Sequence, residues 1–184
     1  LDPGNYTDVL AELDDSIIDE TVNQLQHDKV AKSISEMETD DAVGLIESLQ
    51  PEIQKKILEK VSAKDREIFN ESLNYPEDTA GRRMQKEIVS IPSFWTVGQS
   101  IDFLRDEENL PEDFYELFIV DPANKPLGSV SVSKVLRSDR SIKLNDITTE
   151  SPIFIPADMD QEEAAISFEK YSLVSAGVID KHGR

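Results

Sequence analysis

Hydrophobic residues recur in pairs along the first third of the chain, with twelve residues from one pair to the next. The two members of each pair are three residues apart, and the pairs are Leu10/Leu13, Val22/Leu25, Ile34/Met37, Ile46/Leu49 and Leu58/Val61. An i, i+3 hydrophobic pair marks one face of a helical turn. The polar stretches between pairs contain candidate helix N-caps at Thr39 and Ser62, and Pro51 suits a first helical turn. The pattern predicts short helices of two to three turns, separated by tight turns.

Helices of this length do not bury a hydrophobic stripe alone. Stacked neighbours do, and regular stacking produces an α-solenoid, or superhelix. We therefore expect an N-terminal superhelix of short helices over residues 1–75. An ordinary small helical bundle is the alternative, and the periodicity by itself does not exclude it.

The pattern changes after residues 74–81, where Pro76 and Gly81 indicate a boundary. Strand-like hydrophobic runs then alternate with helical periodicity, which predicts the order β-α-β-β-α. The expected strands cover 88–92, 116–121 and 127–132, and the expected helices begin at Thr96 and Ser133.

The same order begins again near residue 152. A strand at 152–156 matches the first strand, and Asp160 is expected to cap a helix as Thr96 does, because each lies four residues after its proline. Ala164, Ala165 and Phe168 form the expected inner face of this helix, and 176–180 forms the next strand. The chain then stops, so the second repeat is predicted to be truncated. A single mixed α+β domain is the alternative, but it explains the repeated order less well.

The net negative charge of the chain limits the classes of partner that it can bind. The chain has 184 residues, 38 Asp and Glu against 19 Lys and Arg, and a formal net charge of −19. A negative field of this size repels phosphate backbones, so we expect no nucleic-acid partner. Residues 1–50 contain 13 acidic residues and only two lysines, so the first helices should present an acidic surface, which can be merely a solvated face.

Other chemistry is limited by composition. The sequence has no Cys and only two His, which excludes disulfides, thiolate catalysis and Cys-based zinc sites. No apolar run reaches 18 residues, so no membrane span is predicted. The chain begins with Leu1 rather than Met, and we expect it to be a piece of a longer protein.

Several motifs together resemble a known family. The segment Val120-Asp121 followed by Leu127-Gly128, within a repeated β-α-β-β-α order, resembles cystathionine-β-synthase (CBS) domains, which work in pairs. With the acidic helical repeat, the 75–81 junction, the stretch 96–99 and the acidic segment 158–163, the whole chain resembles the cytosolic part of the MgtE family of bacterial magnesium channels. The resemblance implies a helical N domain at 1–75, a junction at 76–87, one CBS domain at 88–148 and part of a second at 149–184.

The resemblance also implies a function. In that family the cytosolic part forms a homodimer through its CBS domains and senses Mg²⁺ bound between the acidic helical domain and the CBS pair. Bound ions keep the pore shut, and their loss opens it. The full protein would then lie at the cytoplasmic face of the bacterial inner membrane, joined to its own transmembrane pore, and this piece would be soluble. Mg²⁺ binds oxygen ligands and retains several waters, so it needs scattered Asp and Glu rather than a tight cage.

Candidate metal ligands follow residue by residue from this resemblance: Asp40 and Asp41 in the helical domain, and Asp160, Glu162 and Glu169 in the second CBS repeat. Asp160 and Glu162 can equally be an N-cap and a residue that complements the helix dipole, and the two roles are compatible.

The chain also departs from the family pattern. Gly44 and Ser172 stand where acids are expected, and Arg82 stands where the family has glycine, so its charge can replace a cation. Some ion sites should therefore be weakened or lost.

Other functions are weaker alternatives. Some CBS pairs bind adenine nucleotides through a Ser or Thr and an Asp three residues later, but here Ser131 is followed by Lys134, so we expect no nucleotide in the first repeat. The short-helix repeat is also similar to the middle region of a flagellar motor switch protein, which makes a protein-binding scaffold possible. An enzyme is the least expected class, since no nucleophile–base pair or phosphate loop is evident. Trp95 is expected to pack in a core or an interface.

Overall fold

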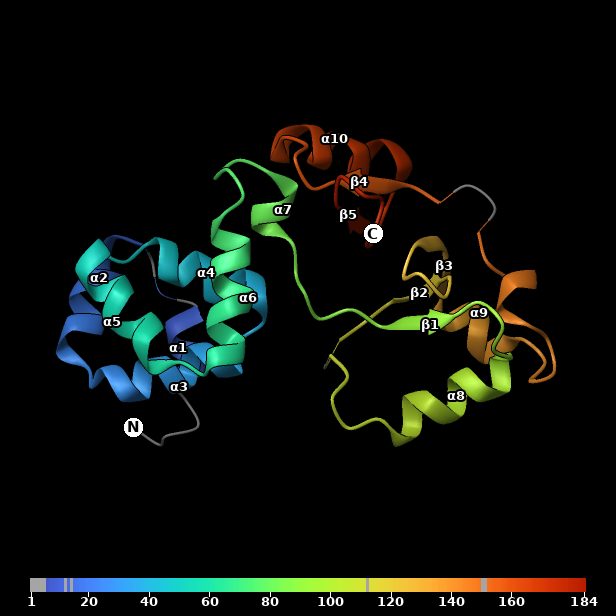
Figure 1. The fold of residues 1–184 in the computed structure, drawn as a ribbon, viewed down its shortest axis with the longest axis horizontal. Helices are drawn as coiled ribbons and strands as arrows, with labels where there is room; N and C mark the ends of the chain where they lie inside the picture. The colour runs from blue at the N-terminus through green and yellow to red at the C-terminus, as the bar shows by residue number, and fades with distance from the viewer. Residues whose placement is uncertain (1–5, 12, 14, 112, 150–151) are drawn as a thin grey trace. The chain divides into compact units, whose positions relative to one another are not determined.

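The computed structural model describes residues 6–11, 13, 15–111, 113–149 and 152–184. The chain divides into two compact units, Leu1–Lys86 and Glu87–Arg184 (Figure 1). Among the described residues the first unit is helical and the second contains the strands, as the sequence predicts. No helix in the described part of the chain combines the length and apolar character needed to cross a bilayer.

The helical unit consists of short helices connected by tight turns. They are α1 (Tyr6–Ala11), α2 (Asp15–Gln24), α3 (His27–Glu36), α4 (Thr39–Glu47), α5 (Pro51–Lys60), α6 (Ala63–Leu73) and the single turn α7 (Ala80–Arg83). Helix α3 packs on α1 and α5, and α4 packs on α6. Three pairs of helices two places apart along the chain are therefore in contact, which is the arrangement expected of a superhelix of short helices.

The twelve-residue pairs form the core of this unit. All ten members are either buried or packed against the buried cluster. Four of the five pairs also close the C-terminal turn of a helix, because the N–H of the second member donates to the carbonyl of the first, as from Met37 to Ile34 at 3.3 Å and from Leu49 to Ile46 at 3.2 Å. The repeat therefore marks where each helix ends as well as which face it buries.

The predicted helix starts are partly right. Ser62 is the N-cap of α6, with its Oγ accepting the Asp65 N–H at 3.1 Å, and Pro51 occupies the first turn of α5. Thr39 is not an N-cap: Glu38 holds that position, and Thr39 is the first residue of α4, with its side chain buried. The prediction for Thr39 was wrong by one residue because burial of its methyl-bearing side chain outweighed its capping preference.

The second unit is built on a three-stranded sheet of β1 (Ser90–Pro92), β2 (Glu116–Val120) and β3 (Pro126–Ser131). Strand β1 is parallel to β2, with Ile91 opposite Ile119, and β2 is antiparallel to β3. Helices α8 (Val97–Asp106) and α9 (Val132–Arg137) and the short 3-10 helix η2 (Leu144–Asp146) complete the first repeat. Leu117 and Ile119 point into its core, where Trp95 packs edge-on against Phe103, as expected of a core residue.

The second repeat begins with the same strand–helix–strand arrangement as the first. Strands β4 (Phe154–Pro156) and β5 (Gly177–Ile179) pair in parallel, with α10 (Gln161–Tyr171) between them. After β4 the Ala157 N–H donates to the Ile179 carbonyl at 2.9 Å, and after β1 the Ser93 N–H donates to the Val120 carbonyl at 3.1 Å. These matching hydrogen bonds agree with the prediction that the β-α-β order of the first repeat begins again near residue 152.

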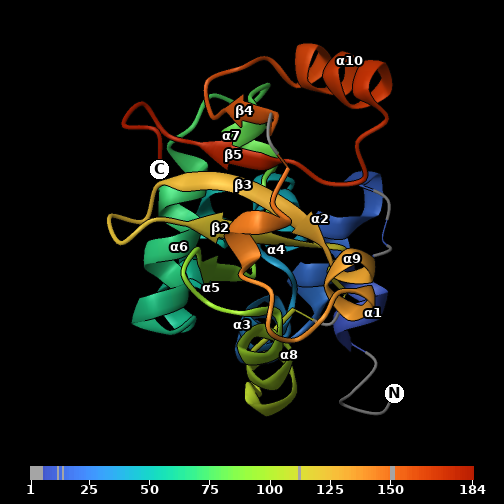
Figure 2. The same cartoon turned by 90° about the vertical axis from the view of Figure 1, so that its right-hand side faces the viewer.

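The two repeats meet across the outer face of the sheet. Helices α8 and α9 lie on one side of β2 and β3, and the β4–β5 pair lies on the other (Figures 1 and 2). Phe118 projects to that second side, where a Cβ placed on Gly177 would lie 3.1 Å from its ring. The chain passing from η2 toward β4 crosses β3, since the Thr149 N–H donates to the Ser129 carbonyl at 3.0 Å.

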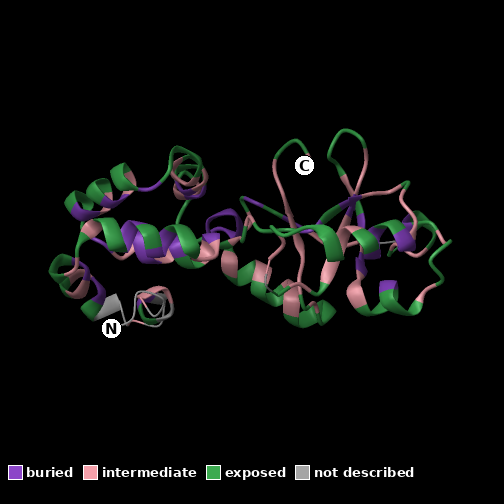
Figure 3. Ribbon diagram, turned by 90° about the horizontal axis from the view of Figure 1, so that it is seen from below, coloured by how far each residue is buried: buried purple, intermediate pink, exposed green. Residues whose placement is uncertain are grey.

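Helix α10 is less enclosed than α8. Helix α8 buries Val97, Gly98, Ser100 and Ile101, whereas α10, which is described throughout, has no buried residue (Figure 3). Ala165, predicted on its inner face, is exposed, while Ala164 and Phe168 are half-buried. The prediction for Ala165 was wrong because α10 lacks packing of the kind that α9 provides against α8 in the first repeat.

Candidate functional site

The acidic candidates of the helical unit lie at the start of α4. Asp40 and Asp41 occupy its first turn, with Asp40 half-buried and Asp41 exposed. Carboxylates at this end of a helix are stabilised by its dipole. One turn further on, a Cβ placed on Gly44 would meet no atom within 4 Å. The helix therefore has room at Gly44 for the acidic side chain that the resemblance leads one to expect.

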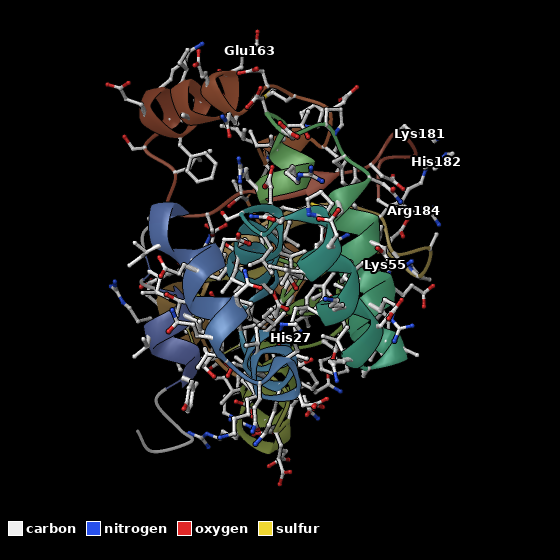
Figure 4. The ribbon with its side chains drawn as sticks, turned by 90° about the vertical axis from the view of Figure 1, so that its left-hand side faces the viewer. His27, Lys55, Glu163, Lys181, His182 and Arg184 are labelled. Carbon is white, nitrogen blue, oxygen red and sulfur yellow. The ribbon has the colours of Figure 1, made fainter. Side chains whose placement is uncertain are left out.

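The candidates of the second repeat lie at both ends of α10. Asp160 is its N-cap, with Oδ1 accepting the Glu162 N–H at 2.8 Å, so its predicted capping role is confirmed. Glu162 is exposed in the first turn, next to Glu163, which Figure 4 labels on α10. Glu169 is exposed near the other end, where its carbonyl accepts the N–H of the left-handed C-cap Ser172 at 3.2 Å.

Neither group of carboxylates forms a preassembled metal centre within its own unit. Among the described residues, no group of three or more Asp, Glu or His side chains is arranged to hold a metal ion. Asp40 and Asp41 belong to the helical unit, and Asp160, Glu162 and Glu169 belong to the second unit. Mg²⁺ commonly retains several waters and takes only one or two carboxylates from a protein. Exposed carboxylates in the first turn of a helix fit such a hydrated ion better than a fully enclosed one.

The two histidines lie at the ends of different elements. His27 is the first residue of α3, and His182 lies in the turn after β5 (Figure 4). They fall in different units. The turn containing His182 is organised by Asp180, whose Oδ1 accepts the N–H groups of His182 and Arg184 at 2.8 and 2.9 Å. The backbone hydrogen bond from Arg184 has the larger effect, and together with the one from His182 it lowers the pKa of Asp180 below its usual value.

Exposed ion pairs fix local geometry in both units. Lys60 Nζ lies 2.5 Å from Asp28 Oδ1 and lowers the pKa of that carboxyl. Arg140 Nη2 donates to both oxygens of Asp102, at 2.8 and 2.7 Å, and this hydrogen bonding lowers the pKa of Asp102. The Asp102–Arg140 pair ties α8 to the loop before η2, where the Gly98 N–H also donates to the Arg140 carbonyl at 2.9 Å.

Ser131 has a structural role in the first repeat. It is the N-cap of α9, with its Oγ accepting the Lys134 N–H at 3.3 Å, and it lies 3.2 Å from the Ser133 hydroxyl. The residue three positions later is Lys134, whose side chain carries an amine rather than a carboxylate. The local geometry therefore accounts for Ser131 without a bound ribose.

Sequence reasoning missed the contacts of the segment after α6. Arg82 was predicted to replace a cation, and the structure places it against Glu47 and the Ser72 carbonyl in the helical unit. The side chains of Gln85 and Lys86 also contact that unit, at Glu38 and Glu71. The excess of basic residues at 82–86 is the only sequence signal of this contact, and it does not identify the partners.

Known proteins with similar sequences and structures have the same arrangement of a helical domain followed by a CBS-like region. Residues 1–78 match the family model of the MgtE intracellular N domain. The magnesium transporter MgtE of Bacillus subtilis (strain 168) is 25% identical over 178 residues, which is 97% of this chain, and the chain spans 40% of that protein's length.

Two solved structures match the whole chain. The soluble part of a magnesium transporter has a TM-score of 0.92 and 26% identity, and this chain covers 73% of it. The cytosolic domain of the Mg²⁺ channel MgtE in complex with ATP has a TM-score of 0.93 and 23% identity, with 75% of it covered. Residues 1–78 therefore correspond to an MgtE intracellular N domain, and the whole chain has the helical-plus-CBS-like fold of the soluble part of a magnesium transporter.

Proposed function

We propose that this chain is the Mg²⁺-sensing regulatory region of a magnesium channel or transporter. The observation that carries the proposal is the match along the entire chain to the soluble part of a magnesium transporter. In the full protein it would lie at the cytoplasmic face of the inner membrane, form a homodimer through its CBS domains and connect to its own transmembrane pore. Mg²⁺ would be both the regulatory ligand and the transported ion.

The electrostatics of the chain favour a cation-controlled equilibrium. A net charge of −19 makes the carboxylates of the two units repel one another at low ionic strength. A dication bound by carboxylates of both units reverses the sign of that interaction. Mg²⁺ then favours a closed state because it binds that state more tightly, and its loss releases the open state. We assign the ligands to Asp40, Asp41, Asp160, Glu162 and Glu169.

The capping role of Asp160 is compatible with metal binding. Its Oδ1 accepts the backbone hydrogen bond from Glu162, and a carboxylate has a second oxygen with further acceptor capacity. The cap also fixes the orientation of the carboxylate at the start of α10. Glu162 lies two residues away in the same turn, where it can contact the same hydrated ion through water.

A nucleotide is not assigned to the first repeat, although a structural relative was crystallised with ATP. Ser131 is occupied as the cap of α9, and Lys134 supplies no carboxylate for a ribose. A protein-binding scaffold is the remaining alternative, and it needs no response to Mg²⁺.

Isothermal titration calorimetry with MgCl₂ tests the assignment. We expect wild-type chain to bind Mg²⁺ and the double variant Asp160→Asn/Glu162→Gln to bind at least roughly tenfold more weakly. Asn is also a good N-cap, so α10 should remain folded. Glu163→Gln is the matched control, since it removes one charge from the same turn without removing a proposed ligand. Equal Mg²⁺ affinity in the double variant and the control would contradict the assignment, and absence of any binding heat in wild type would favour the scaffold.

A further inference from the structure

A buried arginine joins the end of the helical unit to the segment that follows it. Arg82 in α7 is only 7% exposed. Its Nε lies 3.7 Å from Glu47 Oε1 at the end of α4, and its Nη1 donates to the Ser72 carbonyl of α6 at 3.3 Å. A buried guanidinium is costly unless it is paired. Arg82 therefore holds α7 against the ends of two helices.

Neighbouring side chains of the same segment repeat this contact. Arg83 Nη1 lies 3.3 Å from Glu47 Oε2, and Lys86 Nζ lies 3.2 Å from Glu71 Oε1 on α6. The Gln85 side-chain amide donates to the carboxylate of Glu38, just before α4. Four of the five side chains in the segment 82–86 thus bind acceptors on α4, on α6 and on the residue that precedes α4.

The helix dipoles explain why the cations bind at these positions. The carbonyl end of a helix carries a partial negative charge that basic groups stabilise. Neither α4 nor α6, both described throughout, has a basic residue in its own last turn, and α4 ends on an acid, Glu47. Arg82 and Arg83 supply from α7 the positive charge that these two helix ends lack.

We propose that residues 79–86 form a charge clasp that keeps the start of the connecting segment on the helical unit. The hinge for movement between the two units then lies after Lys86 rather than at the Pro76–Gly81 boundary. Eight residues extend at most about 26–29 Å, so release of the clasp would increase the reach of the connection by a distance of that order. The clasp lies wholly within the first unit and does not depend on Mg²⁺ binding.

Amide hydrogen exchange measured by NMR on the full chain tests the clasp directly. The N–H groups of Arg82 and Arg83 both donate to the Thr79 carbonyl, at 3.0 and 3.3 Å, so both should be protected in wild type. In Glu47→Gln, which leaves Arg82 buried without its counter-ion, we expect these two amides to exchange at least roughly tenfold faster. Glu67→Gln, which removes an exposed charge from the middle of α6, is the control and should leave them unchanged.

Two further measurements keep the test decisive if Glu47→Gln unfolds the helical unit. Raising KCl from about 0.05 to 0.5 M should accelerate exchange of the clasp amides in wild type more than that of α5 amides, because salt screens the partly exposed Arg83 and Lys86 pairs. The double variant Glu47→Gln/Arg82→Met should be better protected than Glu47→Gln alone, since it leaves no unpaired buried charge. Unprotected Arg82 and Arg83 amides in wild type, equal exchange in Glu47→Gln and Glu67→Gln, or exchange independent of salt would each overturn the proposal.

Discussion

Replacing Gly128 with alanine should destabilise the second unit. A Cβ at this position would lie 2.4 Å from Thr148 Cγ2 and 3.1 Å from the Thr149 carbonyl oxygen, where the chain crosses β3 on its way to the second repeat. Real Cβ atoms do not approach a methyl group so closely, so either the crossing chain or β3 must shift. Overpacking of this kind typically costs about 1–3 kcal/mol. For a unit of roughly a hundred residues, 2 kcal/mol corresponds to a fall in Tm of about 8–16 °C.

The sequence provides a selective probe for this measurement. Trp95 is the only tryptophan, and it packs against Phe103 in the core of the second unit. Urea unfolding followed by tryptophan fluorescence therefore reports on this unit alone. We expect Gly128→Ala to lower the unfolding midpoint while leaving the m-value unchanged, as for a loss of stability without a change in compactness.

A second substitution tests whether the clash is the cause. Thr148→Ser removes Cγ2 and keeps the hydroxyl that donates to the Leu144 carbonyl at 2.8 Å. In the double variant the 2.4 Å contact disappears, and most of the lost stability should return, which gives a coupling energy of about 1 kcal/mol or more. The steric argument is refuted if Gly128→Ala unfolds within about 0.5 kcal/mol of wild type, or if it costs as much in the Thr148→Ser background as in the wild-type background.

Substitutions at three other positions test separate parts of the account. Gly44→Ala should stabilise α4 by about 0.5–1 kcal/mol in urea unfolding followed by circular dichroism, since its Cβ meets open space, and a loss of stability would contradict this. Gly44→Asp should bind Mg²⁺ more tightly by calorimetry than Gly44→Asn if α4 contributes ligands, and equal affinities would argue against that. Ser172→Gly should stabilise α10 by about 1 kcal/mol because φ is 51° at this C-cap, and no gain in thermal stability would show that Ser172 is unstrained. Asp102 has a pKa lowered by its hydrogen bond from Arg140, so its contribution to stability is present above pH 3.8 and is lost as pH falls through the lower folded-state pKa. Asp102→Asn should therefore weaken the acid dependence of Trp95-detected unfolding below that pH, and an unchanged acid profile would refute this.

The features that sequence predicted well are those determined by local interactions. The twelve-residue pairs identify the buried face because helix burial is periodic, and Asp160 is a cap because its partner, the Glu162 N–H, is two residues away. The helix start at Thr39 was misplaced by one residue because the neighbouring helices bury its side chain. Ala165 was misplaced because its exposure depends on which elements cover α10.

The polar contacts that depend on tertiary structure could not be predicted. Glu47 and Arg82 are 35 residues apart, and only the packing of α7 on α4 and α6 brings them together. The same reason limits the candidate metal ligands. Local sequence identifies Asp160 and Glu162 as acids of one helical turn, but a shared ion also needs groups from other elements, whose positions no local pattern encodes.

The central claim is that Mg²⁺ binding changes the conformation of this region. Small-angle X-ray scattering of the chain tests it most directly, first with chelator and then with about 10 mM MgCl₂ at fixed ionic strength, with about 10 mM CaCl₂ alongside to separate Mg²⁺ from other divalent cations. The account predicts a fall in the radius of gyration with Mg²⁺ that is lost in Asp160→Asn/Glu162→Gln and retained in Glu163→Gln. A radius that is the same with chelator and with Mg²⁺ would contradict it.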